Sequence, residues 1–243
     1  MSVKVLKIGQ VSDIHIGEDE SLVQGIDVRS NFLKAVQSDT MKDLDLLVLS
    51  GDLANENAEP GAYRFVADTI KSLKCPVCII PGNHDDIDVM AKFFDIPAKN
   101  GKCYFRYDLD GRSIFFLDSA CGVVSRDQLE WLESEIPKVD GEVLLFMHHP
   151  PCFCNHRFMD LHYYLHNMVE VQQVLSQFKN LNHVFCGHYH NDFHRKFAHI
   201  DVHVAPSTQM QIDPEKPYFS MRSTEPGWHI IRWGDSVENE VIY

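Results

Sequence analysis

The chain has 243 residues, 44% of them apolar, which is enough to bury a sizeable core within one domain spanning residues 1–243. Asp and Glu outnumber Lys and Arg by 35 to 22, so the formal net charge is −13. This charge disfavours non-specific binding to nucleic acid or to anionic lipid, and we expect neither as a partner.

The start of the chain and the cysteines indicate where the protein works. A short apolar run that contains Lys4 and Lys7 leads directly into a polar motif, so it is typical of a core strand and not of a cleavable signal. No stretch approaches the roughly 20 apolar residues of a membrane span. Seven cysteines, mostly in or beside apolar runs, predict buried thiols without a disulfide framework. We therefore expect a cytoplasmic protein.

The first half of the chain alternates short apolar runs with helical patterns. The spacing predicts strands over 3–11, 45–49 and 76–80 and helices over 28–38 and 61–73. Such alternation of strands and helices indicates an α/β fold with a largely parallel sheet.

The second half mixes hairpins with further helices. Runs over 103–109 and 113–117 flank Asp110-Gly111, which is a hairpin signal. The patterns then predict helices over 127–136 and 168–178, buried strands over 143–147 and 184–186, and late, mostly antiparallel strands over 193–197, 202–205, 228–233 and 237–242. The Pro-containing stretch 206–226 is expected to be an irregular loop, and loops of that length are usually functional or disordered.

Polar side chains recur just past the C-terminal ends of the predicted strands. They fall in five segments, which carry Asp13 and His15, Asp52, Asn83 and His84, His148, and His188 and His190. In open α/β sheets, ligand sites are built at this edge. We therefore expect these side chains to lie close together.

The residue types at this edge indicate a metal site. Asp52 offers a carboxylate that can bridge two cations, Asn83 offers a carbonyl oxygen, and the histidines offer imidazole nitrogens. Such a mixture of nitrogen and oxygen donors suits manganese, iron, zinc or cobalt better than calcium or magnesium. Each motif alone is weak, because a His at a strand end is more often a hydrogen-bonded residue than a ligand. Five segments at one edge together favour the metal site.

These motifs, in this order, resemble the signature of the calcineurin-like metallophosphoesterases. The resemblance runs from near residue 6 to about residue 233. The segments 147–151, 186–188, 206–208 and 226–228 look like those of bacterial class III cyclic-nucleotide phosphodiesterases of the cyclic-AMP type. The segments 25–28 and 146–151 are also similar to bacterial glycerophosphodiesterases of the same superfamily, but the C-terminal segments favour the first group.

The resemblance implies a four-layer α/β/β/α sandwich with a binuclear metal centre. One metal ion would be held by Asp13, His15 and His190, the other by Asn83, His148 and His188, with Asp52 bridging them. Paired cations roughly 3.5–4 Å apart clamp the attacking and leaving oxygens of a phosphoryl displacement, with a metal-bound hydroxide as the nucleophile. The implied reaction is hydrolysis of a phosphodiester, with 3′,5′-cyclic AMP as the first expected substrate.

Four further residues carry expectations. We assign His84 to stabilise charge on phosphorus or to protonate the leaving alkoxide. Asp85 is expected either to orient His84 or to cap a helix that starts at Asp86. Asn55 would bind a phosphate oxygen or cap a turn, and His149 would support the His148 loop or contact substrate.

Three alternatives remain open at this point. A glycerophosphodiesterase or a nucleotide phosphomonoesterase could use the same metals with a different pocket. A non-catalytic, metal-binding scaffold is disfavoured because no ligand of the motif is missing and His84 is present. A homodimer is a further expectation of the resemblance, with 206–226 and the hairpin at Asp110 as candidate surfaces, and the residues do not decide it.

Overall fold

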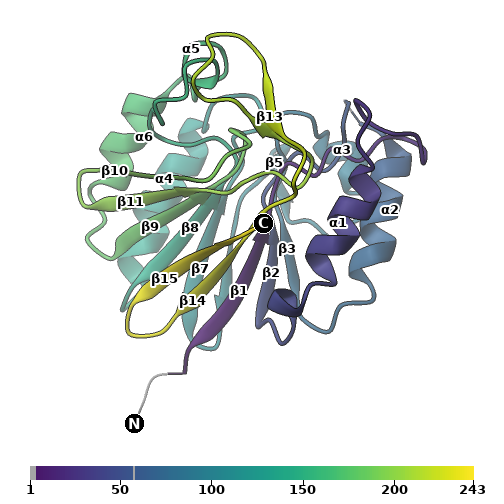
Figure 1. Cartoon of the computed structure of the whole chain (residues 1–243). Helices are drawn as coiled ribbons and strands as arrows, with labels where there is room; N and C mark the ends of the chain where they lie inside the picture. Colours follow the sequence, from purple (N-terminus) through teal and green to yellow (C-terminus); the bar gives the residue numbers. More distant parts are fainter. Residues whose placement is uncertain (1–3, 57) are drawn as a thin grey trace.

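The computed structural model describes residues 4–56 and 58–243, so Val3 of the predicted first strand lies outside the described residues. Two sheets lie face to face (Figure 1). The first has the strand order β15-β14-β1-β2-β3, with β1 at Leu6–Val11, β2 at Leu46–Leu49, β3 at Val77–Ile79, β14 at Trp228–Trp233 and β15 at Val237–Ile242. The second has the order β10-β11-β9-β8-β7-β6, with β6 at Phe105–Leu109, β7 at Arg112–Leu117, β8 at Val143–Met147, β9 at Leu181–Cys186, β10 at Phe193–Phe197 and β11 at Ile200–Val204.

Helices cover the outer face of each sheet. On the first sheet these are α1 (Val28–Val36), α2 (Pro60–Ile70) and the short α3 (Ile87–Met90); on the second they are α4 (Arg126–Glu135) and α6 (Met168–Leu175) (Figure 1). The Asp27 side chain caps α1 by accepting from the Ser30 amide at 2.9 Å. Pro60 opens α2, where its missing N–H costs nothing. The chain is thus an α/β/β/α sandwich.

Three apolar clusters fill the three spaces between the four layers. Strand β2 shows the division, because Leu47 and Leu49 pack against the helices while Leu46 and Val48 pack against the second sheet. Side chains alternate between the two faces of a strand, so a strand buried on both faces reads as a continuous apolar run. Strands of this kind can therefore be predicted from the sequence as short apolar runs.

The predicted hairpin forms and the late strands divide between the sheets. Strands β6 and β7 pair with Leu109 opposite Arg112, and Asp110 and Gly111 both have positive φ, as a two-residue hairpin turn requires. Strands β14 and β15 return to the first sheet beside β1, antiparallel to their neighbours. Strand β11 departs from the antiparallel expectation, because it pairs parallel with β9 while pairing antiparallel with β10.

The remaining elements are short. They are α5 (Met159–His162), the 3-10 turns Asp39–Met41 and Ile136–Lys138, and the two-stranded ladders of β4 (Ala98–Lys99) with β5 (Lys102–Cys103) and of β12 (Gln211–Ile212) with β13 (Met221–Ser223). The stretch 206–226 is therefore a loop pinned by the β12–β13 ladder. Among the described residues, no helix is both long enough and apolar enough to cross a bilayer.

Candidate metal centre

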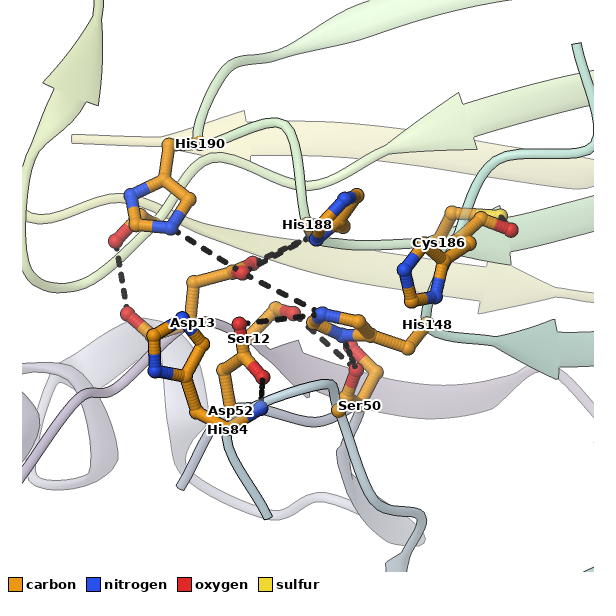
Figure 2. A network of polar contacts seen from close by, with 12 residues as sticks. Ser12, Asp13, Ser50, Asp52, His84, His148, Cys186, His188 and His190 are labelled. Carbon is orange, nitrogen blue, oxygen red and sulfur yellow. Dashed lines mark hydrogen bonds and ion pairs between the residues drawn. The ribbon is translucent and has the colours of Figure 1, made fainter. Parts of the chain in front are cut away.

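The polar side chains that follow the strands meet at one edge of the sandwich (Figure 2). The side chains form two buried groups, and within each group the potential ligand atoms all lie within 4.8 Å of one another. One comprises Asp13, His15, Asp52 and His190, and the other Asp52, His148 and His188. Asp52 belongs to both groups, so its carboxylate lies between them.

Contacts between the two sheets hold this cluster together. The His188 amide donates to both Asp13 carboxylate oxygens, at 3.0 and 2.9 Å, which links the end of β9 to the end of β1. The Ser207 hydroxyl donates to the Asp13 carbonyl oxygen at 2.8 Å. Parallel strands from both sheets end at this edge, so their following residues necessarily face one another.

The backbone at the site is in an unusual conformation. Five of the seven candidate ligands have a backbone φ between 50° and 70°, which residues other than glycine seldom adopt. They are Asp13, His15, Asp52, His188 and His190. Such conformations cost of order 1–3 kcal/mol each and tend to cluster at functional sites. Here they turn each side chain sharply from the strand end towards the centre.

Two glycines allow the chain to approach the carboxylates closely. A Cβ atom on Gly82 would collide with the Asp52 side chain and its backbone nitrogen, and one on Gly187 would collide with Ser12 and Asp13. Only a residue without a Cβ fits at these positions. The Gly82-Asn83-His84 and Gly187-His188 motifs therefore have a packing reason in addition to a chemical one.

Backbone carbonyls determine which nitrogen of each histidine is available. His148 Nδ1 donates to the Ser50 oxygen at 2.8 Å, and His188 Nε2 donates to the Tyr163 oxygen at 2.8 Å. A carbonyl can only accept, so His148 Nε2 and His188 Nδ1 are left free of these bonds. Each imidazole thereby turns its other nitrogen to the centre, as metal-binding histidines do.

Unpartnered buried atoms show that the site suits cations. His148 Nε2 and Asn83 Oδ1 are buried without a hydrogen-bond partner among the described residues. His148 Nε2 lies 3.3 Å and His15 Nε2 3.6 Å from Asp52 Oδ2. Buried polar atoms rarely stay unpaired, and a bound cation would satisfy these. The Asp and His groups are thus suited to a dinuclear metal site.

Burial and mutual charge shift the pKa values of this cluster. Burial acts to raise the pKa of Asp52, but His148 and His15 outweigh it, and the pKa lies well below its usual range. Burial acts to lower the pKa of His148, but the Asp52 and Asp13 carboxylates raise it to about 9. Burial, together with the charge of His148, lowers the pKa of His188 to about 3, so His188 is neutral and free to bind a metal.

His84 lies beside the cluster, with its ring edge-on to His15 at 4.8 Å between centroids. Its amide donates to Asp52 Oδ1 at 2.9 Å, and its Nδ1 donates to the Asn55 carbonyl oxygen at 2.7 Å. The remaining nitrogen, Nε2, is the one available to a ligand. Asn55 therefore contributes a backbone carbonyl that orients His84, a contact the sequence did not reveal.

The expectation that Asp85 caps a helix is wrong, and its carboxylate contacts the two neighbouring loops. Its carboxylate accepts from the amides of Leu53 at 3.1 Å, Ala54 at 3.2 Å and Gly82 at 2.9 Å, and from the Tyr63 hydroxyl at 3.1 Å. It makes no hydrogen bond to the His84 ring, and the residue that caps α3 is Asp86. Asp85 instead ties the loop after β2 to the loop after β3.

His149 packs against the candidate ligands. His149 Nδ1 bonds to the Ser119 hydroxyl at 3.1 Å, and the ring packs on His188 with 4.0 Å between centroids. It also lines a cavity of about 270 Å³ beside Asn83. His203 lies away from the centre and bonds to His183 at 3.1 Å.

A second, larger cavity opens over the centre. It holds about 350 Å³, and its polar lining includes His15, Asp52, Asn83, His84, His188 and His190. Its aromatic lining residues are Phe158, Tyr163 and Phe219. We call these three residues the aromatic wall. They lie in irregular loops without periodicity, so no pattern in the sequence marked them.

The sequence comparisons agree with this geometry. A family model described as calcineurin-like phosphoesterase matches residues 6–192. A protein of Fibrobacter succinogenes named "Probable cyclic nucleotide phosphodiesterase" is 61% identical and covers 100% of this chain and 95% of its own length. The 3′,5′-cyclic adenosine monophosphate phosphodiesterase CpdA of Haemophilus influenzae is 30% identical over 93% of this chain and 85% of its own length.

Solved structures show the same fold at low sequence identity. A dimetal phosphatase from Danio rerio matches with a TM-score of 0.68 and 14% identity, covering 100% of this chain and 99% of its own. The purple acid phosphatase PPD1 from yellow lupin matches with a TM-score of 0.71 and 14% identity, covering 98% of this chain and 51% of its own.

Proposed function

The chain belongs to the calcineurin-like phosphoesterase family, and from this premise we propose that it uses two metal ions to hydrolyse 3′,5′-cyclic nucleotides, cyclic AMP first among them, to nucleoside monophosphates. The observation that carries the proposal is the pair of buried ligand groups that share Asp52. Paired cations held close together can stabilise both the attacking and the leaving oxygen of an in-line phosphoryl displacement.

The proposed ligands divide as the two groups do. Asp13, His15 and His190 would hold one ion, and Asn83, His148 and His188 the other, with Asp52 between them. Support comes from the unpartnered Asn83 Oδ1 and His148 Nε2 and from the nitrogen and oxygen donor set, which favours manganese, iron, zinc or cobalt. When bound, the two cations would neutralise the phosphoryl oxygens and lower the pKa of a water molecule so that it can attack phosphorus.

The side chains around the centre would supply positioning and proton transfer. His84 keeps one proton on Nδ1, which bonds to the Asn55 carbonyl, and the residue lines the cavity. As an imidazolium it would carry a second proton on Nε2, give that proton to the leaving alkoxide and become a neutral imidazole. The chain carries a net charge of −13 and would repel a phosphodiester at a distance. Local positive charge at the centre is therefore needed to attract the substrate.

The substrate class rests on the relatives. The Fibrobacter protein is named a probable cyclic nucleotide phosphodiesterase and the Haemophilus protein a cyclic AMP phosphodiesterase, and each is matched over 85% or more of its own length. Fold similarity at 14% identity adds nothing on substrate, because one fold hosts many activities. A cytoplasmic location is likewise proposed, supported by seven free cysteines, five of them buried.

One substrate panel tests the proposal. A single preparation, stripped of metal with a chelator and reconstituted with manganese, is assayed with cyclic AMP, glycerophosphoethanolamine and AMP. We expect metal-dependent release of AMP from the first and slower turnover of the other two. Faster release of ethanolamine would make the protein a glycerophosphodiesterase, and faster release of phosphate from AMP would make it a phosphomonoesterase. No turnover with two metals bound would leave a metal-binding scaffold.

A further inference from the structure

The aromatic wall is formed by two loops that are far apart in the sequence. Phe158 lies 5.4 Å from Tyr163 and 6.2 Å from Phe219, centroid to centroid, with the rings at 63° and 64°. The Arg157 amide donates to the Pro214 oxygen at 3.0 Å, and the Asp213 amide to the Ser220 oxygen at 2.7 Å. The first bond joins the segment before α5 to the loop between β12 and β13, and the second closes that loop on itself. The two segments lie together at the top of Figure 1.

The wall is attached to the metal centre and open to solvent. The Tyr163 carbonyl accepts the bond from His188 Nε2, so the position of the wall is coupled to a candidate ligand. Tyr163 is 49% and Phe219 46% exposed, although both line the cavity. Exposed apolar groups that gather at a cavity mark a surface that a ligand covers.

A buried, unpartnered amide lies in the same cavity. Gln209 is 2% exposed, and its Nε2 has no hydrogen-bond partner among the described residues. Its backbone amide donates to the Ser207 hydroxyl at 2.8 Å, which fixes the main chain at this position. Leaving a buried amide nitrogen unpaired costs free energy, so a rotation of the side-chain amide that brings Nε2 to an acceptor in this cavity would be favoured.

We propose that the aromatic wall, with Gln209, is the subsite for the planar heterocycle of the substrate, and that Phe219 determines the preference for esters that carry a base. This inference rests on the proposed function, because it places the phosphodiester at the metal centre. The base would stack against the faces and edges of the wall, and Gln209 would donate to an acceptor atom of the nucleoside. The cavity of about 350 Å³ lies within the range of small-molecule sites.

The test compares substrates that differ only in the base. Cyclic AMP and methyl ribofuranoside 3′,5′-cyclic phosphate share the reacting group, but the second has no heterocycle. For Phe219→Ala we expect the KM for cyclic AMP to rise roughly ten-fold, as loss of one base-stacking contact predicts, with kcat within about two-fold of wild type. The KM for the base-free ester should stay unchanged, and Phe219→Tyr should restore the KM for cyclic AMP.

The matched control is Tyr218→Ala, which removes a neighbouring aromatic ring that is 59% exposed and is not among the lining residues. It should leave both substrates unaffected. Gln209→Leu, which keeps the size of the side chain, should raise the KM for cyclic AMP. The assignment of the subsite is wrong if Phe219→Ala changes the KM for both esters equally or changes the KM for neither.

Binding measurements separate this inference from the proposed function. Calorimetric titration with AMP and with ribose 5-phosphate reports the subsite without any turnover. If wild-type protein fails to hydrolyse cyclic AMP, the proposed substrate is wrong. The subsite still stands if AMP binds more tightly than ribose 5-phosphate and Phe219→Ala abolishes that difference, and it falls if the two ligands bind alike.

Discussion

The His188 amide donates to both carboxylate oxygens of Asp13, at 3.0 and 2.9 Å, across 175 residues of sequence. The bond joins the end of β9 in one sheet to the end of β1 in the other. Both residues are buried and both have positive φ. The two halves of the candidate metal centre therefore depend on how the two sheets pack.

This relationship makes Asp13→Asn a test of the ligand assignment. The amide keeps the size of the side chain but loses the negative charge that a cation requires. We expect metal content to fall from two ions towards one per chain and turnover to fall at least roughly 100-fold, since losing even a supporting contact to a ligand costs 10–100-fold. Elemental analysis and a phosphodiester assay measure both quantities. Asp68→Asn, whose side chain is 62% exposed, is the control. Full metal content with full activity in Asp13→Asn would remove Asp13 from the ligand set.

His84→Ala should separate catalysis from metal binding. The His84 ring makes its hydrogen bond to the Asn55 carbonyl, through Nδ1, and not to a candidate ligand. We expect two metal ions per chain to remain while kcat falls about 10²- to 10⁴-fold, the usual contribution of a general acid. Loss of metal in this variant would instead make His84 a ligand.

Gly82→Ala tests the close approach at Asp52. The added Cβ would meet the Asp52 side chain and backbone nitrogen, so the loop after β3 has to move. We expect a loss of about 1–3 kcal/mol in the free energy of unfolding, as for other overpacked sites, together with reduced metal content. Denaturant titration and elemental analysis measure the two effects. Gly234→Ala, where the nearest atom is a Val5 methyl at 3.1 Å, should be much milder.

Asp85→Ala tests the bracing of the two loops. The carboxylate is the acceptor for three amides and for the Tyr63 hydroxyl, so its removal leaves these donors buried and unpaired. We expect the free energy of unfolding to fall by roughly 2–4 kcal/mol, and Tyr63→Phe, which removes one donor, to cost only about 1 kcal/mol. An Asp85→Ala protein with wild-type stability and an altered pH dependence of kcat would contradict this bracing role and would indicate that Asp85 orients His84.

A histidine far from the centre predicts how stability depends on pH. Burial of His203, together with the neighbouring His183, His194 and His229, lowers its pKa to about 3, against the raising effect of Asp201. The unfolded chain binds this proton near pH 6.5 while the folded chain does not, so stability is complete above pH 6.5 and falls as the pH drops towards 3. Between pH 6.5 and 5 the loss is about 2 kcal/mol. Denaturant unfolding at pH 7 and 5 measures it, and His203→Gln should reduce the difference. Equal stability of wild type at both pH values would contradict this prediction.

Local patterns in the sequence predict much of the fold and of the candidate site. Apolar runs marked β1, β2, β3, β8 and β9, because strands buried on both faces carry few polar residues. Asp13, Asp52 and His148 stand directly after such runs, and parallel strands must end at the same edge. The convergence of these side chains was therefore predictable, as was the hairpin at Asp110-Gly111.

Other features depend on contacts that no local pattern records. The nitrogen that His188 turns to the centre is decided by the Tyr163 carbonyl, and the role of Asp85 is decided by amides about thirty residues away. Phe158 and Phe219 form one wall although sixty residues separate them, and neither lies in a periodic element. The sequence by itself determined where the strands lie and which candidate ligands follow them. The strands are marked by apolar runs, and parallel strands bring the residues that follow them to one edge. Only the packing of the two sheets and their loops decided how those candidate ligands are oriented and what covers them, because these depend on non-local contacts.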